Sequence, residues 1–191
     1  MRGTPHLPLP PAMELHTRET SSCPYRRRTG TIASMPSAIT VIGIISDTHG
    51  IMRPSALRAL QGCDLILHAG DIGSPDVLDS LRAVAPVIAV RGNTDTGAWA
   101  RILPQTEIVV TGGMLFCLVH DLSGLDIDPR AAGLRAVISG HSHRPSSAED
   151  GGILYLNPGS AGPRRFSLPV TLARITIRKG RLDSEIIHLR S

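Results

Sequence analysis

Short apolar runs that end in glycine-containing turns are the feature that most constrains the fold of this 191-residue chain. The first run, Ile39–Ile45, is almost continuously apolar, and shorter ones follow at Asp64–His68 and Pro86–Val90. Runs without polar alternation indicate strands buried on both faces, as in a parallel sheet. Between them, Pro54–Leu60 and Ser74–Arg82 have helical patterns, each with a proline suited to the first turn. This alternation of strands and helices predicts a parallel sheet with right-handed crossovers.

The second half of the chain is richer in strands. Its expected strands are Glu107–Val110, Met114–Val119, Ala136–Ser139, Ile153–Leu156, Val170–Ile177 and Leu182–His188. Thr111–Gly113 and Lys179-Gly180 are turn signals that join neighbouring strands. Because this many strands accompany only two clear helices, the pattern predicts two packed sheets rather than one doubly wound sheet.

Side chains that can bind metal ions stand directly after the expected strands, each inside a tight turn. The seven are Asp47, His49, Asp71, Asn93, His120, His141 and His143. In an open α/β sheet, ligands bind in the crevice at the carboxyl ends of the strands. We therefore expect separate strand ends to bring these donors to one rim.

Each of these motifs alone is a weak signal, since an isolated histidine after a strand is more often a hydrogen-bonded structural residue. The repetition of the same strand-then-ligand pattern in independent turns argues against coincidence. Oxygen and imidazole donors gathered from several loops are typical of two-metal hydrolytic sites that cleave phosphate esters. The absence of a GxSxG motif agrees with hydrolysis that forms no covalent enzyme intermediate.

The order of the motifs resembles that of the calcineurin-like metallophosphoesterase superfamily. The motifs are Asp47-Thr-His49, Gly70-Asp71, Gly92-Asn-Thr-Asp95, His120 and Gly140-His-Ser-His143. With Asn157–Ser160 and Pro163-Arg164, the small single-domain form is similar to the YfcE-type branch of that superfamily. The resemblance covers about residues 38–188. It implies a four-layer α/β-β/α sandwich of two mixed sheets flanked by helices, with a dinuclear metal centre at the sheet rim.

The resemblance also implies a role for each donor. Asp47, His49 and His143 would hold the first metal ion, Asn93, His120 and His141 the second, and Asp71 would bridge both. Asp71, Asn93 and His120 are also the candidate catalytic residues. Two divalent cations are implied, Mn²⁺ foremost, with Ni²⁺, Zn²⁺ or Fe as alternatives. A hydroxide shared by the two ions would attack the phosphorus of a small phosphodiester substrate, with phosphomonoesters as the close alternative.

Two positions depart from the wider family. Thr94 stands where many members have a histidine that helps to protonate the leaving group, and a hydroxyl is too weak an acid for that task at neutral pH. We therefore expect substrates whose leaving group needs little protonation, or water as the acid. Asp121 follows His120 where a glycine is common, which predicts a differently shaped turn. Thr94 and Arg164 are the candidate substrate-binding residues; Arg164 and Arg165 either bind phosphate, which suits a guanidinium fork, or are solvated surface arginines.

The positive charge lies mainly outside the expected folded part. Of the formal net charge of +4, residues 1–36 carry five arginines against Glu14 and Glu19, which leaves residues 37–191 almost neutral. A duplex-binding protein usually clusters positive charge on a folded face, so nucleic acid is not an expected partner and a nuclease of the same superfamily is disfavoured. No apolar run approaches the roughly 20 residues of a membrane span.

The composition also divides the chain. Residues 1–36 are rich in Pro, Ser, Thr and Arg without periodicity, and we expect a disordered extension there. Residues 37–191 are expected to form one metallophosphoesterase domain. Cys23, Cys63 and Cys117 are odd in number and lack a CxxC spacing, which indicates reduced thiols and a cytoplasmic protein. A homo-oligomer is left open.

The alternative to catalysis is a protein-interaction scaffold. The retromer scaffold subunit resembles this family but uses the same sandwich mainly to bind other proteins, with an altered metal site. The complete set of donors in this chain favours the enzyme.

Overall fold

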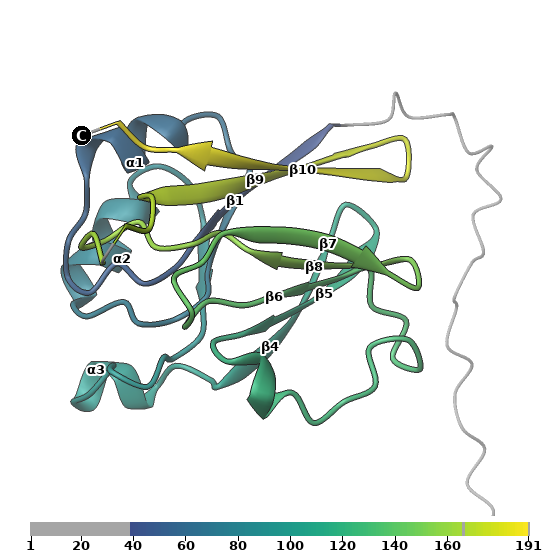
Figure 1. Cartoon of the computed structure of the whole chain (residues 1–191), viewed down its shortest axis with the longest axis horizontal. Coiled ribbons are helices and arrows are strands. Elements are labelled where there is room, and N and C mark those ends of the chain that lie inside the picture. The colour runs from purple at the N-terminus through teal and green to yellow at the C-terminus, as the bar shows by residue number, and fades with distance from the viewer. Residues whose placement is uncertain (1–38, 166, 191) are drawn as a thin grey trace, which may run out of the picture. The chain divides into compact units, whose positions relative to one another are not determined.

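The computed structural model describes residues 39–165 and 167–190 (Figure 1). The extension predicted for residues 1–36 lies outside these ranges, so it stays a prediction. The described elements are β1 (Thr40–Ile45), α1 (Pro54–Ala59), β2 (Leu65–His68), α2 (Pro75–Arg82), β3 (Val87–Ala89), α3 (Ala98–Arg101), β4 (Thr106–Thr111), β5 (Met114–Val119), the 3-10 helix η1 (Leu122–Gly124), β6 (Ala136–Ile138), β7 (Ser146–Asp150), β8 (Ile153–Asn157), β9 (Thr171–Arg178) and β10 (Arg181–His188).

The first sheet has five strands in the order β10-β9-β1-β2-β3. Strands β1, β2 and β3 are parallel and are connected through α1 and α2, as the apolar runs predicted. β1 is fully buried from Ile42 to Ile45, which explains its continuous apolar sequence. On the other side of β1, β9 and β10 are antiparallel, so the sheet is mixed.

The second sheet also has five strands, in the order β4-β5-β6-β8-β7. Its central strands β5, β6 and β8 are parallel, while β4 and β7 pair antiparallel at the two edges. The turn signal at Thr111–Gly113 joins β4 and β5, as expected. β7 was not expected, because its sequence Ser146–Asp150 is exposed along its whole length and has no apolar alternation.

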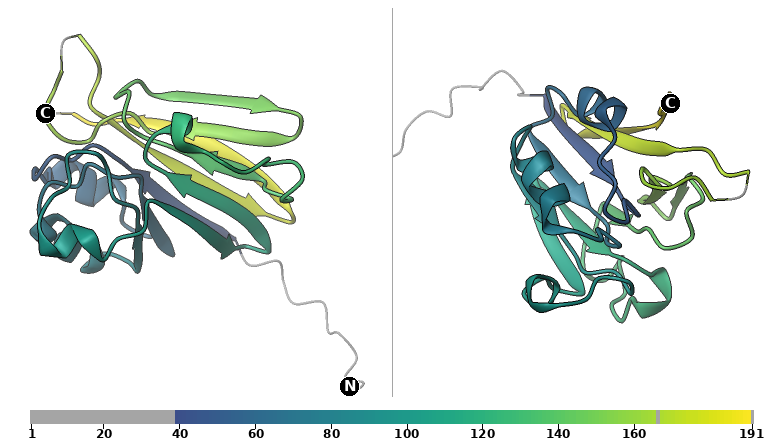
Figure 2. Two further views of the ribbon diagram at one scale, coloured as in Figure 1. Left: turned by 90° about the horizontal axis from the view of Figure 1, so that it is seen from below. Right: turned by 90° about the vertical axis from the view of Figure 1, so that its left-hand side faces the viewer.

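The two sheets pack face to face around one apolar core (Figure 2). Ile42 and Ile44 of the first sheet and Phe116, Leu118 and Ile138 of the second are fully buried in it. Burial of a side chain of this size stabilises the fold by roughly 1.5–3 kcal/mol. This core holds the strand ends of both sheets at fixed positions relative to one another.

The outer faces of both sheets are covered as well. Leu60 of the α1 C-terminus and Leu81 of α2 pack against Ile66 of the first sheet. The second sheet is covered by the segment 122–134, from which Leu125 and Ile127 contact the outer side chains of β5 and β6. The predicted four-layer sandwich of two mixed sheets is thereby confirmed, although its fourth layer is an irregular segment with one 3-10 turn.

The helices are short, with six residues in α1, eight in α2 and four in α3. α2 begins where the sequence indicates: the Ser74 hydroxyl accepts a hydrogen bond from the backbone N–H of Asp76 at 3.2 Å, and Pro75 is the first helical residue. No helix in residues 39–165 and 167–190 has the length and apolar character needed to cross a membrane.

Candidate metal centre

The residues that follow five strands of the two sheets converge on one site. Asp47 and His49 follow β1, Asp71 follows β2, and Asn93 follows β3, all in the first sheet. In the second sheet His120 follows β5, and His141 and His143 follow β6. The side chains of all seven residues are linked by short contacts, and these contacts divide them into two groups with Asp71 between.

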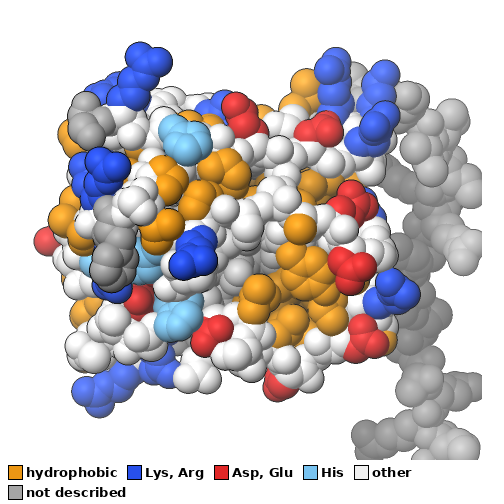
Figure 3. Space-filling model, in the orientation of Figure 1, with side chains coloured by type: hydrophobic (Ala, Val, Ile, Leu, Met, Phe, Trp, Pro, Cys, Tyr) orange, Lys and Arg blue, Asp and Glu red, His pale blue; other side chains and the backbone are white. Residues whose placement is uncertain are grey.

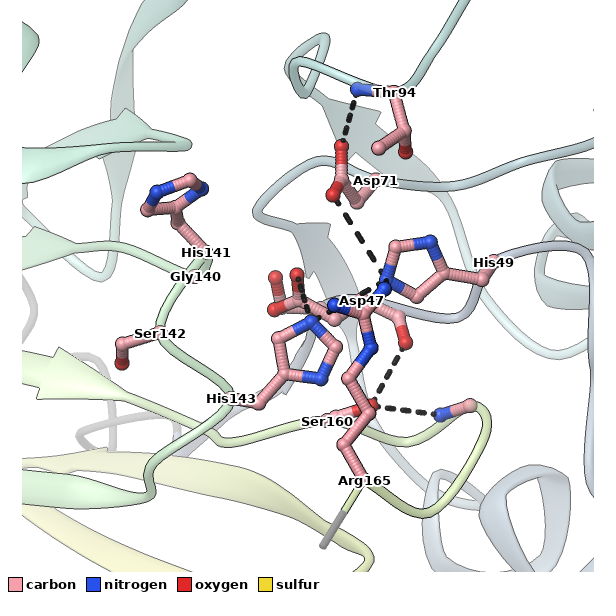
Figure 4. Close-up of polar contacts among 12 residues, drawn as sticks. Asp47, His49, Asp71, Thr94, Gly140, His141, Ser142, His143, Ser160 and Arg165 are labelled. Atoms are coloured by element: carbon pink, nitrogen blue, oxygen red, sulfur yellow. Dashed lines mark hydrogen bonds and ion pairs between the residues drawn. The ribbon is translucent and has the colours of Figure 1, made fainter.

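The first group consists of Asp47, His49 and His143 (Figure 4). The Nε2 atoms of His49 and His143 are only 3.3 Å apart, and the two rings are stacked. Nε2 of His143 is also 3.3 Å from Oδ1 of Asp47. One donor atom from each residue lies within 4.8 Å of the others, so the three could hold one ion.

Asn93 joins the two histidines of the second group. Its Oδ1 lies 3.0 Å from Nε2 of His120 and 3.1 Å from Nδ1 of His141. His120 is buried, whereas Asn93 and His141 are exposed. The second group is therefore the more accessible from solvent.

Asp71 lies between the two groups. Its Oδ2 is 3.8 Å from Nε2 of His49, and its Oδ1 is 3.5 Å from Nε2 of His120. Burial alone would raise the pKa of Asp71, but hydrogen bonds with His120 and with the backbone N–H of Thr94 hold this pKa well below its usual range. Asp71 thus carries a negative charge at the centre of the site.

The environment of Asp47 fits a cation. The residue is fully buried, and neither carboxylate oxygen accepts a hydrogen bond among the described residues; the contact of Oδ1 with Nε2 of His143 at 3.3 Å is not a hydrogen bond. Burial raises the pKa of Asp47 to about 6. A buried charge without a partner is costly, and a bound cation would supply the missing interaction.

The two histidines beside Asp47 are held in the form that binds metal. Burial, together with the neighbouring Arg165 and His49, lowers the pKa of His143 to about 4. Burial also lowers the pKa of His49. Neutral imidazole is the ligand form of histidine, so both side chains are ready to donate a lone pair near neutral pH. The donor set therefore fits divalent cations of the transition series.

The backbone at the site is strained. Five of the seven donors have positive φ angles, namely Asp47 (53°), His49 (45°), Asp71 (53°), His141 (66°) and His143 (57°). Such a conformation costs on the order of 1–3 kcal/mol per residue and is concentrated at functional sites. Backbone hydrogen bonds between the two loops offset the strain: the N–H of Asp47 donates to the Gly70 carbonyl at 3.0 Å, and that of His49 to the Asp71 carbonyl at 2.9 Å.

Two glycines allow the loops to approach so closely. A Cβ atom at Gly92 would overlap the backbone and carboxylate of Asp71, and one at Gly140 would overlap the hydroxyl of Ser46. The turn that carries Asn93 and the turn that carries His141 can therefore lie against the first two turns only because these positions lack side chains.

Polar side chains beneath the site hold its loops. The Ser160 hydroxyl donates to the carbonyl oxygen of Asp47 at 2.9 Å, and the Asn157 amide donates to the carbonyl oxygen of Gly140 at 2.6 Å. Asp95 accepts hydrogen bonds from the N–H groups of Gly73 at 2.8 Å and Gly92 at 2.9 Å. These contacts fix the turns that carry the donors.

The candidate substrate-binding residues lie in different places. Arg165 reaches the site, with its Nη2 3.3 Å from Nε2 of His49 (Figure 4). Arg164, its neighbour, instead lines a separate pocket that also contains His188. Thr94 contacts the site through its backbone N–H, which donates to Oδ1 of Asp71 at 2.9 Å. On the surface, histidine side chains appear next to basic ones on the left of this face (Figure 3).

Two neighbours of the second group were not predicted to contact it: the sequence indicated Asp121 only for the shape of its turn and gave no role to Arg91. Oδ2 of Asp121 lies 3.9 Å from Nε2 of His141. Arg91 lines a pocket that also contains Asn93 and His120. The one signal for Arg91 in the sequence is its position directly before the Gly92-Asn93 turn.

Comparison with known proteins identifies the family. Residues 41–180 match the calcineurin-like phosphoesterase superfamily domain. A probable metallophosphoesterase from Methanothermobacter thermautotrophicus is 35% identical over 160 residues, which cover 78% of this chain and 92% of that protein.

Solved structures show the same fold. An archaeal phosphodiesterase has a TM-score of 0.65 at 23% identity, covering 78% of this chain and 100% of that chain. Vps29 from Entamoeba histolytica, in complex with Zn²⁺, has a TM-score of 0.59 at 24% identity, covering 78% of this chain and 99% of that chain. The domain match spans most of the sandwich and confirms the predicted family. This chain therefore belongs to the calcineurin-like phosphoesterase superfamily.

Proposed function

We propose that this protein is a phosphodiesterase that uses two divalent cations. The observation that carries the proposal is the convergence of a complete donor set around Asp71, on a chain of a phosphoesterase superfamily. Asp47, His49 and His143 would hold one ion and Asn93, His120 and His141 the other, with Asp71 shared between them. A small phosphodiester would be the substrate.

Bound divalent cations supply Lewis acidity and lower the pKa of bound water towards neutrality. The chain contributes charge and orientation. Asp71 keeps its negative charge between the two donor groups, since its pKa is lowered. Arg165, beside His49, is placed to bind a phosphate oxygen. Because Thr94 is too weak an acid to protonate a departing alkoxide, esters with acidic leaving groups should react fastest.

The donor types favour a transition-metal ion. Four histidines and three oxygen donors make up the set, which suits Mn²⁺, Ni²⁺, Zn²⁺ or Fe better than Ca²⁺ or Mg²⁺. We propose Mn²⁺ as the working ion. We also propose a cytoplasmic location, supported by the free thiols of Cys63 and Cys117.

The proposal is tested by assaying metal-stripped protein on bis(4-nitrophenyl) phosphate and on 4-nitrophenyl phosphate. Mn²⁺, Ni²⁺, Zn²⁺ and Mg²⁺ are added back singly. We expect turnover of the diester to exceed that of the monoester and to be restored best by Mn²⁺. Asp71→Asn should lose at least about a hundredfold in kcat, because the shared carboxylate would be neutral.

Asp183→Asn, a change of the same kind on the exposed part of β10, is the matched control and should keep wild-type activity. Full activity in Asp71→Asn, or no turnover of either ester with any ion, would contradict the proposal. Complete inactivity would favour the protein-interaction alternative, since Vps29 shares this fold.

A further inference from the structure

A pocket of about 260 Å³ adjoins the second group of donors. Asn93 and His120 line it, together with Arg91, Gln105 and Thr106 from the neighbouring segments. Two proposed metal ligands therefore form part of its wall. Any phosphate held at the centre would lie next to this pocket, and one of its ester groups could enter it.

Arg91 gives the pocket an available positive charge. Its backbone N–H donates to the carbonyl oxygen of Pro104 at 2.8 Å, which fixes the residue at the start of the loop after β3. The side chain is half-buried, and within the described parts of the chain no carboxylate lies within ion-pair distance of its guanidinium. A partly desolvated guanidinium without a partner is a strong binding group for a carboxylate or phosphate.

Asp121, the carboxylate that lines the same pocket, contacts other groups than Arg91. Oδ1 of Asp121 accepts a hydrogen bond from the N–H of Ser123 at 3.0 Å, and its Oδ2 faces Nε2 of His141 at 3.9 Å. Asp121 therefore forms no ion pair with Arg91, and the guanidinium is left to bind an anionic group.

The size of the pocket limits what can enter. Sites for drug-sized ligands usually measure about 300–1,000 Å³, so a pocket of about 260 Å³ suits a group somewhat smaller than such a ligand. A polynucleotide or a long lipid chain would not be enclosed by it.

We propose that this pocket selects phosphodiesters in which one ester group is small and carries a second negative charge, which Arg91 binds. The inference rests on the proposed function and adds the substrate class to it. Gln105 and Thr106 offer an amide and a hydroxyl for the polar atoms of the same group.

Three 4-nitrophenyl diesters with a common leaving group test the inference. Their second groups are carboxymethyl, ethyl and choline, which are anionic, neutral and cationic. The wild-type protein with Mn²⁺ should show a kcat/KM about tenfold or more higher for the carboxymethyl ester than for the ethyl ester. Arg91→Gln should abolish this ratio, and Arg91→Lys should retain part of it.

Arg178→Gln is the matched control, because Arg178 is exposed at the end of β9 that lies away from the site. It should keep the wild-type ratio. Equal rates for the carboxymethyl and ethyl esters, a preference for the choline ester, or a preserved ratio in Arg91→Gln would overturn the inference.

A binding measurement separates this inference from the proposed function. Calorimetry with Mn²⁺ present compares phosphoglycolate with ethyl phosphate, which differ in the second anionic group. Tighter binding of phosphoglycolate that disappears in Arg91→Gln supports the pocket even if no ester is hydrolysed. Equal binding of the two compounds by the wild-type protein overturns it, whatever the turnover.

Discussion

At the scale of single residues, burial decides what each histidine can do. His143 is buried and His49 half-buried beside a carboxylate, and each directs Nε2 towards the other donors. His68 is fully buried in β2, where its Nε2 lies 2.9 Å from the hydroxyl of Thr48. It contacts a structural threonine rather than the donors, so its role is to hold the turn after β1.

His68 gives the protein a pH-dependent stability. Burial lowers its pKa from the ordinary value of 6.5 to about 3, so the folded state favours the neutral form. The contribution of His68 to the free energy of unfolding is complete above pH 6.5 and is lost as the pH falls towards 3. In that range the unfolded chain binds a proton at this residue and the folded state does not. The free energy of unfolding should fall by up to about 1.4 kcal/mol per pH unit from this group.

Urea unfolding at pH 7, 6 and 5 in the presence of a chelator measures the effect. His68→Gln should show a smaller pH slope than the wild type over this range, whereas His188→Gln, at an exposed position of β10, should not. Identical slopes in His68→Gln and the wild type would show that His68 does not titrate as proposed.

At the scale of elements, the sequence predicted the strands that have an apolar pattern and missed the elements that have none. β1 and β2 were predictable because strands buried on both faces must be apolar throughout, and the half-buried β3 has an apolar sequence as well. β7 was not, because it is held by backbone pairing with β8 while its side chains are exposed. α3 has only four residues, too few to produce a helical period.

The residues of the site also divide into those that a sequence pattern predicts and those that it does not. The seven donors could be named because each stands at a strand end, where the position of the chain follows from the sheet. The sequence named Arg164 as the substrate-binding candidate, whereas Arg165 is the arginine that reaches the site, because the irregular loop after Gly162 decides which of the two points there. The pocket at Arg91 is formed by segments distant in sequence and leaves no local pattern.

The N-cap of α2 is a further feature of this scale with a measurable consequence. Ser74→Ala removes the acceptor for the N–H of Asp76 and should lower the free energy of unfolding by about 1 kcal/mol. Ser80→Ala is the control, because Ser80 lies half-buried within the same helix and its hydroxyl donates only to the carbonyl oxygen of Asp76. Chemical denaturation measures both; equal effects of the two changes would show that the cap does not stabilise α2.

At the scale of the whole molecule, the two donor groups draw residues from both sheets. Asp47 and His49 belong to the first sheet and His143 to the second, while Asn93 belongs to the first and His120 to the second. The proposed centre is therefore not a property of either sheet alone. It depends on the apolar core that holds the sheets together.

Cation binding should consequently stabilise the entire fold. At a hundredfold excess of free Mn²⁺ over its Kd, the expected gain is about 2.7 kcal/mol in the free energy of unfolding. Asp47→Asn should lose most of this gain. In chelator the same variant should be more stable than the wild type at neutral pH by about 1–3 kcal/mol, because the fully buried unpaired charge is removed.

These differences are measured by thermal or urea unfolding, once with Mn²⁺ and once with chelator. The proteins compared are the wild type, Asp47→Asn and the control Asp183→Asn. A wild-type protein whose stability does not respond to Mn²⁺, or an Asp47→Asn variant that is less stable than the wild type in chelator, would contradict the expectation.

The distribution of donors over both sheets also has a consequence for the unfolded chain. Each proposed ion would close a loop between residues far apart in sequence, from His49 to His143 in one case and from Asn93 to His141 in the other. Such a closure restricts the conformations of the open chain as a covalent cross-link does, and the restriction grows slowly with loop length. With both ions bound, the strand ends at this rim would therefore unfold only together. The amide protons at these strand ends would then exchange with solvent at a common rate.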